Sequence, residues 1–280
     1  MDNAIADTAV RSHTALVAAL RNPAAYPHSV ETVEVVETHI SSVLLAGDYA
    51  YKLKKPVDLG FVDFSMLARR RYFCEEEVRL NRRSAPSLYL GVVPITRSRD
   101  GASLCVDGEG TPVDYAVRMR RFARDACLDQ MAQRGTLHAP LIDQLAEAIA
   151  AFHRRCDSAP SARTLGTPDE IRRWTMDNLS ELQRLTPITS QRQRIERLAR
   201  WTEVEFARRA PVFAERRAAG CVRECHGDLH LGNLVLIQGQ PVLFDCIDFN
   251  PQLRFIDVMS DVAFTWIDLI DHRLPRLAWR

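Results

Sequence analysis

Lysine is scarce in this sequence. Of the 37 lysine and arginine residues, only Lys52, Lys54 and Lys55 are lysines, and all three lie in the stretch AYKLKKPV. Lysine carries a compact ammonium on a flexible stem, whereas arginine carries a planar fork. A site that needs a point cation against a phosphate oxygen can therefore prefer lysine. The alternative is chance clustering at a solvated strand end, and this stretch alone does not decide between the two.

Long apolar runs are also missing. Crossing a bilayer takes about 18 apolar residues, and no run in the sequence approaches that length. The first residues include Asp2, Asp7 and Arg11 and lack the apolar core of a signal peptide. The seven cysteines form no C-x-x-C pair, which favours reduced thiols, and a net charge of +1 argues against a general nucleic-acid binder. We therefore expect a cytoplasmic protein with neither membrane nor nucleic-acid partners.

The first part of the chain is predicted to be rich in strands. Residues 8–21 have helical spacing, 30–38 alternate like a strand, and 41–54 indicate a hairpin that turns at Gly47 and Asp48. A long helix over 66–85 and strands over 89–98 and 112–122 follow. Side chains of a strand repeat every two residues, so Lys52 and Lys54 are expected on one face.

The second part is predicted to be mainly helical. Three long amphipathic helices are expected over 137–156, 167–185 and 188–220, and residues 233–249 indicate two short strands that turn at Gly239. The predicted fold class is α+β, with two lobes. An antiparallel β lobe with one helix spans 1–117, a mainly helical lobe spans 118–280, and residues 116–122 connect them.

The segment ECHGDLHLGNLVL carries the densest set of reactive side chains. His226, Asp228, His230 and Asn233 fall within eight positions, just before an apolar strand. An Asp and an Asn five positions apart are spaced as in the protein-kinase catalytic loop, where the Asp accepts the proton of the attacking hydroxyl and the Asn holds a metal ion. Twelve residues beyond Asn233, Asp245 ends an apolar run. If the hairpin forms, Asn233 and Asp245 meet at one end and offer oxygen ligands to Mg²⁺.

Two other interpretations of this segment remain open from the residues alone. His226 and His230 have the spacing of packed, hydrogen-bonded histidines. A zinc site is a second alternative, because Cys221, Cys225, His226 and His230 supply four zinc-type ligands within ten residues. Against zinc, Cys225 and His226 are adjacent and hard to direct at one ion, and the Asp, Asn and Gly residues would have no role.

The pair CHGDLHLGN and LFD closely resembles the catalytic motif of the aminoglycoside phosphotransferase family, whose pattern is His-Gly-Asp-x-His-x-x-x-Asn followed by a metal-binding Asp. The resemblance runs from about residue 15 to the end and includes a branch often fused to a C-terminal P-loop ATPase domain. It implies a kinase-like fold, ATP and Mg²⁺ as cofactors, and a small-molecule hydroxyl as acceptor. Related proteins continue with more helices, so the chain is expected to end within its helical lobe.

The resemblance implies roles for residues that match the motif. Asp228 is the expected catalytic base, and Asn233 and Asp245 are the expected Mg²⁺ ligands. His226 and His230 are expected to brace the loop. A later Asp should bond back to this loop, for which the sequence offers Asp257 first and Asp261 second, although both also suit helix capping.

The resemblance also implies a nucleotide site in the first lobe. A lysine of the third strand contacts the phosphates and a Glu of the next helix holds it. We favour Lys52 over Lys54, and Glu77 as the partner. The sequence has no glycine-rich loop at the turn ETHISSV and no Walker motif, so the backbone with Thr38, Ser41 and Ser42 is the expected phosphate contact, unless this is an ordinary turn. Adenine is expected at the main chain of Met119, Arg120 and Arg121.

Three functions follow. The first is an ATP-dependent phosphotransferase acting on a hydroxyl of a small molecule. The second is a nucleotide-binding regulatory module with weak catalysis, working with a P-loop ATPase domain or protein. The third is the zinc protein. The sequence does not indicate which acceptor is used.

Overall fold

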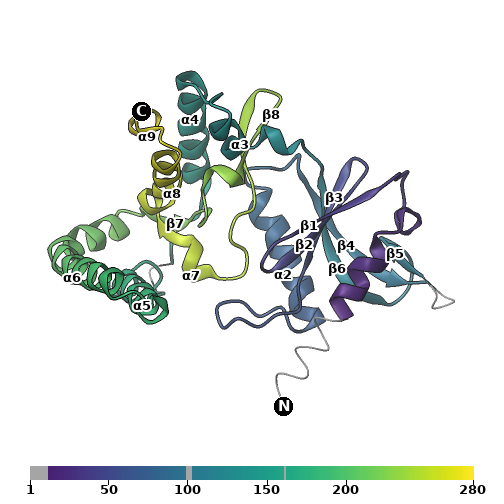
Figure 1. Cartoon of the computed structure of the whole chain (residues 1–280), viewed down its shortest axis with the longest axis horizontal. Coiled ribbons are helices and arrows are strands. Elements are labelled where there is room, and N and C mark those ends of the chain that lie inside the picture. The colour runs from purple at the N-terminus through teal and green to yellow at the C-terminus, as the bar shows by residue number, and fades with distance from the viewer. Residues whose placement is uncertain (1–11, 99–102, 161) are drawn as a thin grey trace, which may run out of the picture.

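The first lobe is built on a six-stranded antiparallel sheet. The structure is a computed structural model that describes residues 12–98, 103–160 and 162–280. The strand order is β1-β2-β3-β6-β4-β5 (Figure 1). The strands span Val33–Glu37 (β1), Ser41–Ala46 (β2), Tyr49–Lys54 (β3), Tyr89–Arg97 (β4), Leu104–Val106 (β5) and Pro112–Arg120 (β6).

The predicted hairpin of β2 and β3 is confirmed. Ala46 pairs with Tyr49, so two residues make the turn, and Gly47 has a φ of 56°, a conformation that side chains rarely adopt. The register places Val43 opposite Lys52 and Leu44 opposite Tyr51. The lysines therefore share one face of the sheet, as predicted, and the aromatic and leucine side chains share the other.

Each face of the sheet is covered by a different helix. A helix over residues 12–20 packs on the face of Leu44, Tyr51 and Leu53 through the buried Leu20. The lysine face is covered by α2, Leu67–Asn81, whose contacts lie mainly with β6 and β4. Figure 1 shows α2 between the sheet and the second lobe. Residues 8–11 of the first predicted helix lie outside the described residues.

The second lobe is mainly helical. Its longer helices are α4 (Ala139–Arg155), α5 (Pro168–Leu185), α6 (Thr189–Ala218) and α8 (Val258–Asp271), and its short ones are α3 (Leu128–Gln133), α7 (Pro251–Arg254) and α9 (Pro275–Trp279). The hairpin of β8 (Leu234–Ile237) and β9 (Gln240–Leu243) packs between them. Its buried Leu234 and Leu243 join Leu145 and Phe152 of α4 and Leu269 of α8 in one core.

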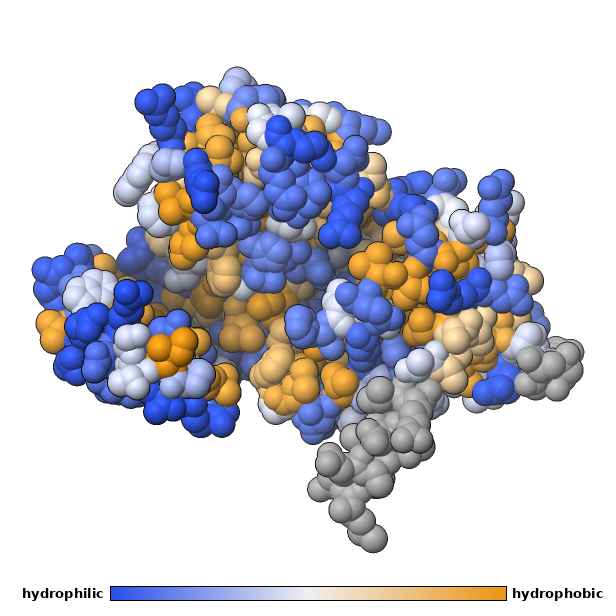
Figure 2. All heavy atoms as spheres, viewed as in Figure 1, coloured by the Kyte–Doolittle hydropathy of each residue, from blue (hydrophilic) through white to orange (hydrophobic). Residues whose placement is uncertain are grey.

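The hairpin of α5 and α6 extends away from the rest of the second lobe (Figure 1). Thr167 caps α5 by accepting a hydrogen bond from the backbone of Glu170, which explains why the helix begins at Pro168. Figure 2 shows a mainly hydrophilic outer surface on this hairpin and a recess with hydrophobic residues between it and α7. Across the described ranges, no helix has the length and apolar content that membrane crossing requires.

The predicted α+β class, with a β lobe followed by a helical lobe, is confirmed. Several short features were not predicted: β5, the helices α3, α7 and α9, and a two-stranded sheet of β7 (Val222–Glu224) and β10 (Phe255–Asp257). Strand β6 continues to Arg120, so most of the predicted connection at 116–122 belongs to the sheet.

Candidate active site

The motif around Asp228 forms a loop between β7 and β8. Gly227 has a φ of 85°, and a Cβ at this position would lie 2.8 Å from the carbonyl oxygen of Leu253. Only glycine fits such a left-handed conformation against another backbone. The turn leaves the Asp228 side chain accessible, and Asp228 lines a pocket beside α5 and α8.

His226 joins two parts of this site. Its Nε2 bonds to the carbonyl oxygen of Phe244, so Nε2 carries the proton, and its Nδ1 accepts a hydrogen bond from the backbone of Asp228. Burial lowers the pKa of His226, which keeps this tautomer neutral. The ring therefore links the loop of Asp228 to the residue that precedes Asp245, a position that suits the bracing role expected for it.

His230 lies on the exposed side of the loop. Its Nε2 is 3.5 Å from Oδ2 of Asp228, and hydrogen bonding to Asp228 raises the pKa of His230. Its Nδ1 accepts a hydrogen bond from the backbone of Gly232. His230 thus contacts the expected base directly, besides holding its own turn.

One stripe of α8 holds the backbone of this loop. Asp261 accepts hydrogen bonds from the backbone N–H groups of His226 and Gly227, at 3.1 and 2.8 Å. Thr265 donates to the carbonyl oxygen of Leu229, and Asp268 accepts from the backbone of Leu231 at 2.7 Å. Positions 261, 265 and 268 are four and three residues apart, which places them on one face of a helix. Sequence reasoning missed Thr265 and Asp268, although this spacing was the available signal.

The preference for Asp257 as the residue that bonds back to the loop is wrong. Asp257 caps α8 through the backbone of Met259 and forms a two-bond ion pair with Arg216. It lies at the N-cap, just before the first residue of the helix, where its side chain accepts from a free N–H group. Asp261, one turn later, points back to the loop.

The hairpin brings Asn233 and Asp245 to the same end, as predicted. Leu234 pairs with Leu243, and the backbone of Phe244 donates to Asn233 at 3.0 Å. The Asn233 amide nitrogen donates to the backbone and side chain of Asp228, which leaves its amide oxygen pointing away from that residue. Asp245 is half-exposed. A free amide oxygen beside an accessible carboxylate fits the oxygen ligands that Mg²⁺ takes.

Lys52 and Lys54 both pair with Glu77. Glu77 lies between their ammonium groups at 2.9 Å from each, while Lys52 also contacts Asp245 at 2.5 Å and Lys54 contacts Asp248. Burial raises the pKa of Glu77, but the two lysines outweigh it and bring the pKa down to about 2. Burial also raises the pKa of Asp248 to about 6. Asp248 was not predicted as a site residue. The sequence indicated it only as a second carboxylate, three residues after Asp245 of LFD.

The environments of the two lysines differ. Lys54 is fully enclosed, between Glu77, Asp248 and the ring of Phe64. Lys52 lines an open pocket that also includes Asp245. Lys52 is therefore the lysine with access to a ligand, and Lys54 is enclosed between the lobes.

The three hydroxyl groups expected at the phosphates are turned away, hydrogen-bonded within the turn, or buried. Ser42 is on the opposite face of the sheet from Lys52, and its hydroxyl bonds to His13 and Glu37. The Thr38 hydroxyl bonds to Ser41 and closes the turn. Ser41 is on the lysine face but is 1% exposed. The expectation for Ser42 is wrong because alternation along β2 turns it away.

The pocket beside Lys52 is mainly apolar. It has a volume of about 260 Å³ and is bounded by Val36, Val43, Tyr89, Met119, Phe122 and Phe244, together with Arg120 and Arg121. The backbone N–H groups of Arg120 and Arg121 donate to Leu88 and Asp48, so they are not available to a ligand. The predicted segment therefore lines the pocket, but these two N–H groups do not serve adenine.

The four residues of the zinc alternative do not meet. Within the described part of the chain, one group of three His, Cys, Asp or Glu residues has its potential metal-ligand atoms within 4.8 Å of one another. It consists of His153, Cys225 and Asp261. Both oxygens of Asp261 already accept hydrogen bonds, and burial raises the pKa of the Cys225 thiol. His153 and Asp261 hydrogen-bond to each other, whereas the Cys225 thiol donates to the carbonyl oxygen of Ile256. His226 and His230 make their own separate hydrogen bonds.

Comparison with family models decides the family. The model of the phosphotransferase enzyme family, APH, matches residues 74–278, which include the whole of the second lobe's site. The chain belongs to this family. The predicted resemblance is thereby confirmed at the level of the APH family; no fusion to a P-loop domain is shown.

Several relatives and solved structures are similar to this APH chain. Uncharacterized proteins of Mycobacterium tuberculosis and Mycobacterium bovis are 32% identical over 237 residues, covering 85% of this chain and 46% of theirs. The chain thus spans about half the length of these curated relatives. Among solved structures, the streptomycin-ATP-APH(2")-IIa ternary complex is 14% identical with a TM-score of 0.40, covering 96% of this chain and 85% of its own. A glucosamine kinase is 20% identical with a TM-score of 0.40, covering 95% and 66%.

Proposed function

We propose that the chain is an ATP-dependent phosphotransferase that moves the γ-phosphoryl group to a hydroxyl of a small molecule. One continuous series of contacts carries this proposal. Lys52 contacts Asp245, the β8–β9 hairpin places Asp245 at the same end as Asn233, and Asn233 donates to Asp228. It joins the Lys52 ammonium, the oxygen ligands of Asn233 and Asp245, and the accessible carboxylate of Asp228. Phosphoryl transfer requires this set, since its catalysis consists mainly of positioning and charge stabilisation.

In the proposed reaction, Asp228 orients the acceptor hydroxyl and accepts its proton. The acceptor oxygen forms a bond to the γ-phosphorus while the bond from that phosphorus to the β–γ bridging oxygen breaks, and ADP leaves. Lys52 binds the α- and β-phosphates, and the apolar pocket beside Met119 and Phe122 holds the base. Asn233 and Asp245 would hold Mg²⁺, which supplies charge neutralisation at the phosphates.

The proposed role of Asp228 predicts a large loss of turnover in Asp228→Asn. An amide keeps the shape of the side chain but cannot accept the proton, and general-base catalysis contributes about 10²–10⁴-fold. ADP release should fall by that range while nucleotide affinity stays nearly unchanged. Asp271→Asn, at the exposed end of α8, is the matched control. Unchanged turnover in Asp228→Asn would contradict the assignment.

The length of the relatives favours a second candidate. Because the chain spans about half of their length, our alternative is a regulatory module that works with a P-loop ATPase domain. The two candidates differ in turnover: a regulatory module binds ATP with Mg²⁺ and shows no Asp228-dependent phosphoryl transfer to any alcohol. We also place the working protein in the cytoplasm, since all seven cysteines are free thiols.

A further inference from the structure

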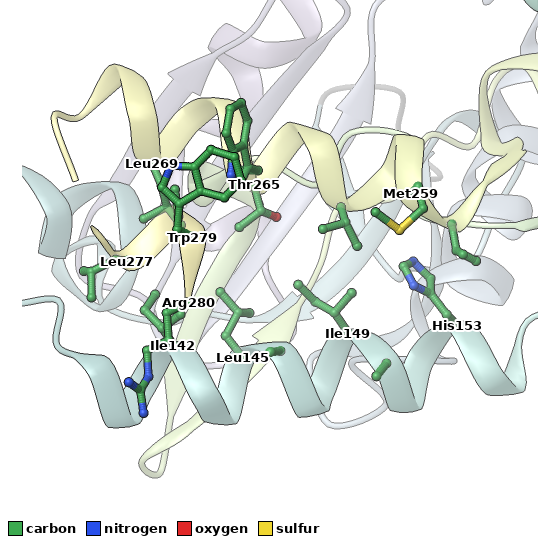
Figure 3. A pocket seen from close by; sticks show the side chains of 16 residues that line it. Ile142, Leu145, Ile149, His153, Met259, Thr265, Leu269, Leu277, Trp279 and Arg280 are labelled. Atoms are coloured by element: carbon green, nitrogen blue, oxygen red, sulfur yellow. The ribbon is translucent and has the colours of Figure 1, made fainter. Parts of the chain in front are cut away.

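Two cavities lie against different faces of α8. The first, about 360 Å³, is an apolar space between α4, α8 and α9. Figure 3 shows Leu145 and Ile149 of α4 facing Met259 and Thr265 of α8 across it. Of the described side chains that line it, none has a buried polar atom without a hydrogen-bond partner. This cavity therefore contains nothing that selects a polar ligand.

The second cavity, about 440 Å³, lies beside the expected base. Gly227 and Asp228 form one wall, the first turns of α5 form another, and Leu253, Phe255 and Phe264 contribute apolar surface. Its volume is in the range of ligand pockets, which are mostly apolar with a few placed polar groups. We name it the acceptor pocket. It is the recess between the α5–α6 hairpin and α7 that is visible in Figure 2.

Two buried polar atoms of the acceptor pocket have no hydrogen-bond partner among the described residues. They are Oε1 of Glu170 and Nε1 of Trp174, one turn apart on α5. Glu170 is only 7% exposed. A buried polar group without a partner costs about 1–3 kcal/mol, so such groups are rare unless a ligand completes them. One of these atoms needs a donor and the other needs an acceptor.

Helix capping explains the position of only one of the two carboxylate oxygens of Glu170. Its Oε2 accepts a hydrogen bond from the backbone of Gly166 at 2.6 Å, as a residue near a helix start commonly does. Capping leaves Oε1 unused and does not involve Trp174. The nearest cation to Oε1 is the exposed guanidinium of Arg173, at 3.9 Å, too far for a hydrogen bond.

The charge of the acceptor pocket is negative. Asp257 at its edge is neutralised by two hydrogen bonds from Arg216. Glu170 and Asp228 have no hydrogen-bonded arginine of this kind: the guanidinium of Arg173 is 3.9 Å from Glu170, and His230 is 3.5 Å from Asp228. Of the described residues that line the pocket, none is a lysine or an arginine. A buried carboxylate favours an ammonium over a neutral donor, because ionised hydrogen bonds are the stronger ones. With one such carboxylate besides the base, the pocket suits a single positive charge.

We propose that the acceptor is a monocationic amino alcohol with an apolar or aromatic body, whose ammonium binds Oε1 of Glu170. This inference rests on the proposed function. The hydroxyl donates to Asp228 while its oxygen accepts from Nε1 of Trp174, and the apolar body lies against Leu253, Phe255 and Phe264. A polycationic sugar would leave further ammonium groups against apolar walls, which is costly.

Binding of three probes tests this inference. Phenylalaninol carries the hydroxyl, ring and one amine; 3-phenylpropan-1-ol lacks the amine; streptomycin is polycationic. With ADP and Mg²⁺ present, calorimetric titration should give phenylalaninol the highest affinity, at least about tenfold above the neutral alcohol, as expected when a buried charge finds its partner. Equal affinities of the two phenyl alcohols, or preference for streptomycin, would overturn the inference.

Two variants locate the contacts. Glu170→Gln keeps an oxygen for the Gly166 backbone but removes the charge, and should weaken phenylalaninol binding at least about tenfold without weakening the neutral alcohol. Trp174→Phe keeps the ring and should weaken phenylalaninol about threefold to tenfold. Glu181→Gln, on the exposed part of α5, is the matched control. Unchanged phenylalaninol affinity in Glu170→Gln would also overturn the inference.

The same titrations separate this inference from the proposed function. If phenylalaninol binds through Glu170 but Asp228→Asn does not change its phosphorylation, the pocket assignment holds and the catalytic assignment fails. If ATP and Mg²⁺ support Asp228-dependent phosphorylation of 3-phenylpropan-1-ol as well as of phenylalaninol, the catalytic assignment holds and the amine selectivity fails.

Discussion

Two neighbouring lysines on β3 have different surroundings although their sequence positions look equivalent. Alternation places Lys52 and Lys54 on one face, and both pair with Glu77. Lys52 opens to the apolar pocket, whereas Lys54 is sealed against Asp248. We infer that lysine is kept at these two positions because each needs a compact ammonium. At Lys52 the ammonium serves a ligand, and at Lys54 it serves the structure.

Substituting each lysine by methionine should separate these roles. Lys52→Met should weaken ATP binding at least about tenfold with a modest loss of stability, because Glu77 keeps Lys54 as its partner. Lys54→Met should lower the free energy of unfolding by about 3–5 kcal/mol, because it leaves Asp248 as an uncompensated buried charge. Nucleotide titration and urea denaturation measure the two effects. The reverse pattern would assign the phosphate contact to Lys54.

At the scale of elements, the loop of Asp228 is held by a helix that is distant in sequence. Asp261, Thr265 and Asp268 on one stripe of α8 bond to four backbone groups between residues 226 and 231. A loop without regular hydrogen bonds needs such partners for its backbone. The hairpins were predictable because their turns are local, whereas β7 and β10 were not, because three-residue strands carry too little pattern and pair across more than thirty residues.

The stripe predicts that Thr265→Val lowers turnover without lowering ATP affinity. Valine has a similar shape but leaves the Leu229 carbonyl oxygen without its donor, and a small displacement of a catalytic group can cost up to about 100-fold in rate. We expect kcat to fall about 10- to 100-fold, and Thr265→Ser, which keeps the hydroxyl, to restore it. A positioning role is contradicted if Thr265→Ser is as slow as Thr265→Val, or if Thr265→Val changes only stability.

At the scale of the whole molecule, α2 connects the two lobes. Glu77 holds the two lysines that bond to Asp245 and Asp248, and Asn81 accepts from the backbone of Cys246 at 2.9 Å. Arg79, between Glu77 and Asn81, and Arg83, just beyond the end of the helix, bond to Glu224 of β7. The helix therefore fixes the sheet against the segment that carries the expected metal ligands.

The low pKa of Glu77 predicts how this connection responds to acid. Because the folded-state pKa is about 2, below the ordinary value of 4.5, Glu77 contributes stability that is present above pH 4.5 and lost as the pH falls toward 2. Glu77→Gln should be less stable than the wild type by a few kcal/mol, on the order of 3, at pH 7. This difference should shrink between pH 4.5 and 2.

Urea denaturation at a series of pH values measures that difference. Glu75→Gln, on the exposed side of the same helix, is the control and should show a small difference at every pH. A difference for Glu77→Gln that stays constant from pH 7 to pH 2 would contradict the linkage.

The sequence by itself determined the two-lobed α+β layout, both hairpins and the residues of the loop around Asp228, because turn chemistry, alternation and motif spacing are all local. Only the tertiary structure decided that Asp261 rather than Asp257 holds this loop, that Ser42 faces away from the lysines, and that Glu170 and Trp174 lie beside Asp228. Contacts between distant segments depend on how the helices pack, and a helix shows the same polar spacing whichever neighbour it meets.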